Sequence, residues 1–505
     1  MQQTLFDLGQ EPVKLSPVSV LKRKLYQDFI ADRFDSPLGY FFILFIGFGL
    51  AYFVGTEGVE VALATLGMVL AIPALMGALF HLRFGVYMTL TTSVFILGVK
   101  RFVGDVPIGV FLDAAVIVML FGLLIKQIKE RDLSFLKHPL SIFVIAWIGY
   151  SLFEGFNPYP RSIIPWIYTV RHIALLMLIY FVGLYVFSKA SYIRNLMRLW
   201  VGLSTLGALY GLKQVIWGFS AAEYEWIMAD AGIFELYYLV DRFRIFSFFS
   251  DPTVFGIMMA ASSLMCIPFL RDPNIGRWKR LGIGLLTILM LIAMIYSGTR
   301  TAYIIFPAGL FFMTAMKPTR DMIVMSASVL MLGLGLLIIP TENQQILRLR
   351  TAFSPESSDS YQTRIQNQAY IQPIIQEYPI GNGLGTTGIW GQRFAPERLL
   401  SQFPPDSGYV RLGVETGWIG LLLFCSFMAA ILWVSIRTYF RSKNEIQQRY
   451  ALAFFGFLFA LILAHYPQQA ITQLPNSIMF YLSMAVIIRI RDVKWPEAER
   501  TKVID

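Results

Sequence analysis

Charged residues are what this sequence lacks most. Only 15% of its 505 residues are charged and 56% are hydrophobic, whereas a soluble protein of this length carries about 25% charged residues. Apolar runs of roughly 16 to 23 residues recur along the chain, which is the length that crosses the hydrocarbon core of a bilayer. The composition therefore excludes a soluble enzyme and predicts an integral membrane protein.

Residues that bind metals or form disulfides are also scarce. The two cysteines, Cys266 and Cys425, fall inside apolar runs, where cysteine is usually a small core residue. The 4 histidines are too scattered for a metal site of the usual spacing. The sequence contains no Asp-x-Asp, the carboxylate pair that is common in metal-dependent sugar-nucleotide sites. We therefore predict neither a metal nor another cofactor.

The apolar runs predict an all-α fold, a polytopic membrane helix bundle of about fourteen transmembrane helices. A polar, basic tail (1–37) precedes the first span, and a second tail (489–505) follows the last. Spans 1–11 occupy 38–339 and spans 12–14 occupy 416–488. The predicted spans are 38–54, 59–80, 84–99, 107–125, 139–153, 166–187, 195–217, 252–270, 281–297, 301–316, 322–339, 416–436, 450–465 and 474–488.

Lysine and arginine gather in alternate turns between these spans. The turns KQIKERDLSFLK, RDPNIGRWKR and RTYFRSKNEIQQR are basic, whereas GTEG and YPQQAITQ hold neither residue. Basic residues accumulate in cytoplasmic loops, so both termini are expected in the cytoplasm. The net charge of +10 is thus interpreted as a topology signal, and no nucleic-acid partner is expected.

One long polar segment, 340–415, interrupts the apolar pattern and is expected outside the cytoplasm. It is far longer than an ordinary loop, which favours a functional role, and its apolar residues at helical spacing predict short helices within it. A second outward excursion, 218–250, is amphipathic and aromatic, as expected of a helix lying at the membrane interface. We interpret 340–415 as the catalytic loop, and its arginines include Arg348, Arg350, Arg364, Arg393 and Arg411.

Four arginines are expected at or near the outer membrane face: Arg242, Arg244, Arg300 and Arg364. A guanidinium group binds phosphate oxygens in a bidentate fashion, so such a cluster suits a pyrophosphate or another polyanion. The alternative for any one of them is that it reaches up to lipid headgroups. A charge near the bilayer usually has a partner or ligand, and several on one face favour a ligand.

Other candidate residues have plain structural alternatives. YPIGNGLG (378–385) is better explained as a tight turn than as a phosphate-binding loop, because it lacks the Lys-Ser/Thr of that motif. Asp406 and Glu415 flank the entry to the span at 416 and could line one cavity, although Glu415 could equally form a salt bridge with Arg411 four residues earlier. Supporting candidates are Glu415, Tyr409, Arg411, His172 and Arg171; His172 is the residue of this set expected to be packed or paired.

Four blocks together resemble the O-antigen polymerase and ligase superfamily, the Wzy-type and WaaL-type membrane proteins. They are RFRIFSFFSDPTVFG (242–256), YSGTRTAYI (296–304), RIQNQAYIQPIIQEYPIGNGLG (364–385) and DSGYVRLGVETGWIGLLLF (406–424). Each block alone is weak, but the four occur in the family's order. From the start of the first to the end of the last, they span about 180 residues of the chain.

The resemblance implies a metal-independent membrane glycosyltransferase in the bacterial cytoplasmic membrane, acting at its outer face. Its donor would be a glycan on undecaprenyl pyrophosphate, and Arg242, Arg244, Arg300 and Arg364 would hold the pyrophosphate. Arg300 and Arg364 would also be catalytic, together with Asp406 as the base on the acceptor hydroxyl. Other implied partners are a lipid-linked acceptor, membrane lipids, a flippase and a chain-length regulator.

The sequence departs from the family at two places. The ligases usually have His-Asn where this chain has Asp406-Ser407, which favours the polymerase branch; Asp251-Pro252 also differs from the usual Pro-Asn. The first hypothesis is a polymerase of lipid-linked repeat units for O-antigen, capsule or exopolysaccharide. The alternatives are a ligase that transfers glycan to a lipid or protein and, less favoured, a flippase or transporter. Asp406 could instead only orient an arginine.

Overall fold

A computed structural model describes residues 59–103, 109–239, 242–341, 344–353, 359–402 and 407–495, with single residues between 41 and 55. The chain divides into two compact units, Met1–Leu70 and Ala71–Asp505. The second unit contains every site discussed below. The helix α4 (Val59–Phe80) begins in the first unit, and the predicted span 38–54 lies largely outside the described residues.

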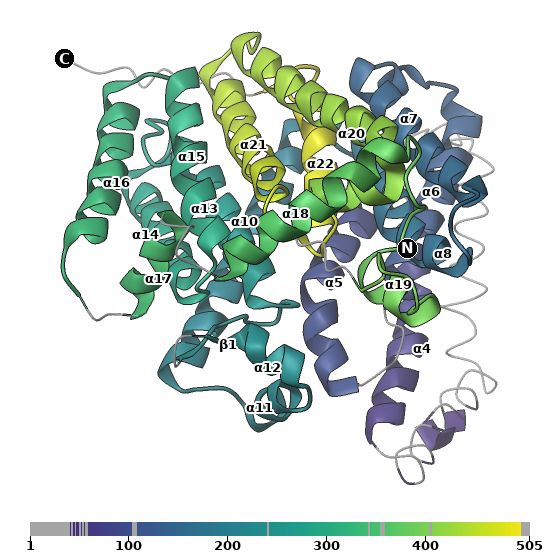
Figure 1. Ribbon diagram of the computed structural model, residues 1–505. Coiled ribbons are helices and arrows are strands. Elements are labelled where there is room, and N and C mark those ends of the chain that lie inside the picture. The colour runs from purple at the N-terminus through teal and green to yellow at the C-terminus, as the bar shows by residue number, and fades with distance from the viewer. Residues whose placement is uncertain are drawn as a thin grey trace, which may run out of the picture. The chain divides into compact units, whose positions relative to one another are not determined.

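The described chain is helical almost throughout (Figure 1). Every predicted span from residue 59 onward overlaps a helix. Nine helical segments of the described residues are long and apolar enough to cross a membrane, so a polytopic helix bundle is confirmed and the count of fourteen stays a prediction. The helices of the bundle are α5 (Leu82–Val103), α6 (Val110–Glu130), α7 (Pro139–Phe153), α8 (Ile164–Val170), α9 (Ile179–Val186), α10 (Ala190–Ile216), α13 (Pro252–Cys266), α14 (Arg277–Tyr296), α15 (Arg300–Met316), α16 (Arg320–Ile338), α20 (Gly408–Phe440), α21 (Glu445–Ala464) and α22 (Asn476–Arg489). α8 and α9 are the two ends of one apolar segment, Ile164–Val186.

Two helices form the centre of the large unit. α13 packs against α14, α15 and α21, and α21 packs in turn against α20 and α22. The apolar segment of α13 is 89% buried, whereas that of α16 is only 6% buried. Both helices are apolar, so this difference in burial indicates that α13 is surrounded by protein, whereas the sides of α16 face lipid. Figure 1 shows α16 beside α15 at the edge of the unit.

The excursion 218–250 was predicted as a helix at the interface, but it is built from smaller pieces. Its elements are α11 (Ala221–Met228), α12 (Ala231–Tyr237) and an antiparallel pair of two-residue strands, β1 (Tyr238–Leu239) and β2 (Arg242–Phe243). Asp230 is the N-cap of α12, because its side chain accepts hydrogen bonds from the first amides of that helix. The cap separates α11 from α12. The buried side chains of Ile227, Tyr237 and Phe246 give the excursion its own small aromatic core.

The segment 340–415 contains α17 (Gln344–Phe353), α18 (Asp359–Glu377) and α19 (Gly388–Phe394), of which α17 and α19 are short and α18 has 19 residues. α17 packs on α15, α18 packs on α20, and α19 packs on α8. Aromatic stacking fixes the last of these contacts, since the rings of Trp390 and Tyr168 lie 4.3 Å apart. The described part of the segment therefore rests on the membrane helices.

A pair of glycines joins this segment to α20. The helix bends at Gly417, which has φ of 69°, and Gly381 has φ of 73° in the YPIGNGLG turn. A Cβ atom on Gly381 would lie 2.3 Å from the Gly417 nitrogen, and one on Gly417 would lie 2.1 Å from the Pro379 oxygen. Backbone bonds complete the junction, with Asn382 N donating to Val414 O and Gly383 N to Glu415 O, both at 2.9 Å. The turn interpretation of YPIGNGLG is confirmed.

We expect Gly417→Ala to lower stability by about 2–5 kcal/mol. A left-handed backbone costs a non-glycine residue about 1–2 kcal/mol, and forcing an extra methyl group into a packed contact costs about 1–3 kcal/mol more. Gly202→Ala is the matched control, because Gly202 lies in α10 with nothing within 4 Å of an added Cβ. The measurement is thermal unfolding of both purified variants in detergent. Equal melting temperatures would contradict the proposed close packing.

Candidate functional site

A cavity of about 400 Å³ lies where the long polar segment meets the helix bundle. Its walls come from the first turns of α20, the end of α21 and the chain between α21 and α22. The N-cap of α13 and residues of α19 also contribute to the lining. The polar lining residues that matter here are His172, Asp251, Arg411, His465, Gln469 and Thr472. Residues far apart in the sequence therefore meet in one cavity whose lining is largely apolar with a few polar groups, which is where a ligand site is expected.

Arg411 is held in this cavity by two side chains. Its Nε donates to Glu415 Oε1 at 3.0 Å and its Nη1 donates to Gln469 Oε1 at 2.6 Å. Glu415 is fully buried and also accepts a hydrogen bond from the Thr387 hydroxyl. These bonds use two of the five N–H groups that a guanidinium offers. The predicted Arg411–Glu415 salt bridge is confirmed, and it fixes Arg411 at the cavity wall.

His172 reaches the cavity from an irregular turn. The helix from Ile164 to Val186 contains a π-helical turn over Arg171–Leu175, and such turns often mark functional sites in helices. Arg171 points elsewhere and forms an ion pair with Asp113 on α6, with Nε donating to Oδ2 at 2.6 Å. Arg171 thus has a structural partner, whereas His172 lines the cavity.

His465 is a buried cavity residue that the sequence did not single out. It follows the last residue of α21, and only 1% of its surface is exposed. Its Nδ1 accepts a hydrogen bond from the Ile471 amide at 3.3 Å, so in this geometry Nδ1 carries no proton. The ring is then neutral with its proton on Nε2, and Nε2 has no partner among the described residues. His465 therefore offers a hydrogen-bond donor.

Tyr409, which contacts a lining residue, and Asp251, which lines the cavity, have structural roles. Tyr409 stands edge-on to the His465 ring and donates its hydroxyl to Ile462 O at 3.2 Å. Asp251 accepts hydrogen bonds from the amides of Thr253 and Val254 at 2.8 and 2.9 Å. This is the N-cap of α13, with Pro252 at its first turn. The departure Asp251-Pro252 therefore has a local structural explanation.

Arg244 lies in a second cluster, against the turn between α14 and α15. It is 8% exposed, and its guanidinium donates to Ser297 O at 2.8 Å, Leu236 O at 3.0 Å and Thr299 Oγ1 at 3.1 Å. Arg348 of α17 donates to Gly298 O of the same turn at 3.3 Å. Burial, and then the charge of Arg348, lower the pKa of Arg244 to about 10, so Arg244 remains a cation at neutral pH.

The other three predicted arginines lie on different elements. Arg300 begins α15 directly after this turn and is half-buried, whereas Arg242 of β2 is exposed. Arg364 lies on α18, and its side chain is outside the described residues. The structure thus brings Arg244 and Arg348 to the turn that precedes Arg300, while convergence of Arg244, Arg300 and Arg364 on one cavity stays a prediction.

The predicted base, Asp406, lies outside the described residues. Its chain neighbours Ser407 and Gly408 begin α20, with the Ser407 hydroxyl accepting from Val410 N at 3.3 Å. A Cβ on Gly408, a cavity residue, would lie 2.2 Å from His465 Cε1. The start of α20 is therefore packed directly onto the cavity.

The arrangement suits an anionic ligand and contains no evident metal site. Among the described residues, no group of three or more His, Cys, Asp and Glu side chains could hold a metal ion. Arg411 presents N–H donors to the cavity, and His172 and His465 add imidazole groups. Cationic donors fixed before a reaction can stabilise charge on a leaving phosphate.

Residues 285–425 match the family model described as O-antigen ligase. This family includes Wzy-type polymerases and WaaL-type ligases, so the resemblance is confirmed for the matched stretch. Three of the four sequence blocks lie inside the match, and the first block, 242–256, lies before it. The match also includes Arg411 and Glu415 but neither His172 nor His465. No curated protein matches the chain.

Proposed function

We propose that this membrane protein, with its O-antigen ligase domain at residues 285–425, polymerises oligosaccharide repeat units linked to undecaprenyl pyrophosphate. Family membership leaves a polymerase and a ligase open. The observation that carries the choice is Asp406-Ser407 at the position where the family's ligases have His-Asn. The product would be an O-antigen, a capsule or an exopolysaccharide.

In the proposed reaction, an acceptor hydroxyl attacks the anomeric carbon of the donor sugar. The bond from that carbon to the pyrophosphate oxygen breaks, and undecaprenyl pyrophosphate leaves with both electrons of the bond. Asp406 takes the hydroxyl proton, while Arg411 and the arginines of the Arg244–Arg300 region stabilise the leaving pyrophosphate. The fixed position of Arg411, through Glu415 and Gln469, supports this role.

A deletion strain tests the polymerase proposal directly. Loss of a polymerase leaves single repeat units on the final acceptor, whereas loss of a ligase leaves lipid-linked polymer. Loss of a flippase leaves repeat units facing the cytoplasm. We expect single repeat units, measured as glycan length on the final acceptor and on the lipid carrier, and long lipid-linked polymer would contradict the proposal.

We also propose that the cavity faces outward and that both termini lie in the cytoplasm of a bacterium. In a cysteine-free background, Leu399→Cys should react with a membrane-impermeant thiol reagent in spheroplasts. Leu399 is 72% exposed in the segment between α19 and α20. Asn274→Cys, in the basic turn before α14, should react only after the membrane is opened. The reverse pattern would invert the topology.

The ligase alternative requires a histidine base, and His465 is the histidine to be considered for that role. The chain lacks histidine at the ligase position, but His465 packs against Gly408, two residues after Asp406. His465 is therefore a histidine that lies near the start of α20, although the motif itself contains no histidine. Its Nδ1 is occupied by the Ile471 amide and its Nε2 carries the proton, so this ring donates rather than accepts. That geometry favours Asp406 as the base.

A further inference from the structure

A second cavity, of about 1070 Å³, lies at the other end of the same helices. It is lined at the start of α5, the end of α6, the end of α9, the first turns of α10 and the end of α22. The cavity of the candidate active site instead touches Leu97 near the end of α5 and Leu474 before α22. Fifteen helical residues separate Leu82 from Leu97, which is about 22 Å.

Basic residues gather at this end of the helices. The adjoining turns carry exposed Lys129, Arg131, Lys137 and Lys189, together with Arg491 and Lys494 beyond α22. By the rule that places such residues inside, this cavity opens toward the cytoplasm, away from the proposed reaction. It is therefore a separate site, and its role does not depend on the polymerase assignment.

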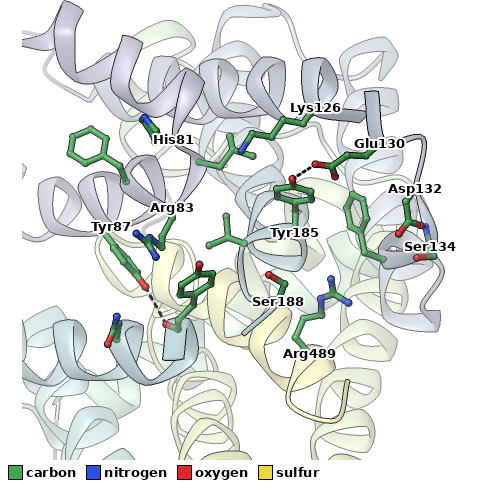
Figure 2. Close-up of a pocket in the computed structure, with 16 residues that line it drawn as sticks. His81, Arg83, Tyr87, Lys126, Glu130, Asp132, Ser134, Tyr185, Ser188 and Arg489 are labelled. Atoms are coloured by element: carbon green, nitrogen blue, oxygen red, sulfur yellow. Dashed lines mark hydrogen bonds between the residues drawn. The ribbon is translucent and has the colours of Figure 1, made fainter. Parts of the chain in front are cut away.

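The lining combines cations with hydroxyl groups from several helices. Figure 2 shows the side chains of Arg83, Lys126 and Arg489 around Tyr185 and Ser188. The Arg83 guanidinium carbon lies 4.7 Å from the Tyr192 ring centre, and Lys126 Nζ lies 5.3 Å from that of Tyr185. Ring faces orient such cations without neutralising their charge.

The two carboxylates of the lining are turned toward neutral donors. Glu130 accepts a hydrogen bond from the Tyr185 hydroxyl at 2.8 Å, and Asp132 accepts one from the Ser134 amide at 2.9 Å (Figure 2). Three cationic side chains against two carboxylates leave the lining net positive, and a third carboxylate, Asp492 beside the lining, pairs with Arg489 at 3.7 Å. An anion that can accept several hydrogen bonds is the complementary ligand, and phosphate oxygens meet that requirement.

An apolar surface continues from this cavity along the bundle. Phe84 lines the cavity and is 48% exposed, and Leu124 and Ile128 on the neighbouring helix α6 are 60% and 76% exposed. Such side chains on a membrane helix face acyl chains. The volume exceeds what a single inorganic phosphate fills, whereas a lipid headgroup with its upper chains needs both the charged cavity and the apolar flank.

We propose that this cavity binds the phosphate-bearing headgroup of an acidic phospholipid of the cytoplasmic leaflet, with Arg83, Lys126 and Arg489 as its cationic contacts. The lipid would bridge α5, α6, α9, α10 and α22 at one end. Basic cavities between transmembrane helices on the cytoplasmic side are suited to such headgroups.

The test compares lipid binding by the purified full-length protein and three variants. Native mass spectrometry would count retained phosphatidylglycerol and phosphatidylcholine, and thermal unfolding would measure stabilisation by each lipid and by inorganic phosphate. We expect a preference for phosphatidylglycerol that falls roughly tenfold in Arg83→Gln and in Lys126→Gln. Arg198→Gln is the matched control, since Arg198 is an exposed arginine of α10 outside the lining.

Each outcome of this comparison is decisive. Unchanged phosphatidylglycerol binding in both lining variants would overturn the site. Equal stabilisation by inorganic phosphate and by phosphatidylglycerol would show a soluble phosphate ligand and overturn the lipid assignment. Melting temperatures without lipid verify folding, and Lys126→Gln keeps the test valid if Arg83→Gln does not fold.

Discussion

Arg411→Ala is expected to abolish detectable polymer and also to destabilise the protein. Its loss removes the partner of the buried Glu415 carboxylate, and breaking a buried ion pair from one side costs about 3–5 kcal/mol. Its loss also removes a charged donor from the cavity, which should cost about 1.5–3 kcal/mol of donor binding. That second cost is roughly a 10- to 150-fold loss of affinity.

A double variant separates these two effects. In Arg411→Ala/Glu415→Gln no buried carboxylate is left without a partner, so much of the lost stability should return. If Arg411 contacts the donor, polymer synthesis stays lost in the double variant. If Arg411 only holds Glu415 and Gln469 in place, synthesis returns with stability. The measurements are melting temperature in detergent and chain extension per folded molecule.

Arg449 provides a matched control for a buried arginine with an acidic partner. It pairs with Asp272 and, at 2.6 Å, with Glu445, and its side chain is 5% exposed. It lies outside the lining of the candidate active site. Arg449→Gln should therefore lower the melting temperature while chain extension per folded molecule remains near normal. A loss of activity equal to that of Arg411→Ala would remove the argument for donor contact.

The helices were the part of this fold most accessible from sequence. The predicted spans 59–80 and 139–153 coincide with α4 and α7, because a helix in lipid must be apolar over about 20 residues. The span predicted at 416–436 begins eight residues late, since α20 starts at Gly408. Its first turns carry Arg411 and Glu415 and rest on protein rather than on lipid, so hydropathy does not detect them.

The site was only partly predictable for a related reason. The Arg411–Glu415 pair follows from helical i, i+4 spacing, and the sequence offered it as one of two alternatives for Glu415. Gln469, which holds the other side of Arg411, is 58 residues further along the chain, and no periodicity connects two such positions. The π-helical turn that carries His172 and the packing of His465 on Gly408 are likewise tertiary features. A histidine at the end of the predicted span 450–465 was the one signal in the sequence for His465.

Asp406→Asn is expected to retain donor binding and to lose chain extension by roughly 100-fold, the low end of the usual range for a general base. Asparagine keeps the shape and most hydrogen bonds of aspartate but cannot take a proton. An unperturbed Asp has a pKa of about 3.9 and is a weak base at neutral pH, and nearby arginines would weaken it further, which is why the expected contribution is modest. The measurements are binding of lipid-linked donor and chain length on a defined repeat unit.

Two companion variants distinguish base catalysis from the alternatives. Ser407→Ala removes the hydroxyl that caps α20, a change worth about 1 kcal/mol of helix stability. It should leave extension nearly intact unless Asp406 acts merely by starting the helix. His172→Gln removes the cavity imidazole that is free to accept a proton, because His465 presents its N–H. Near-normal polymer from Asp406→Asn together with loss in His172→Gln would transfer the base role to His172. Loss of donor binding in Asp406→Asn would instead show that the carboxylate orients an arginine, and leaving-group stabilisation would then carry the rate.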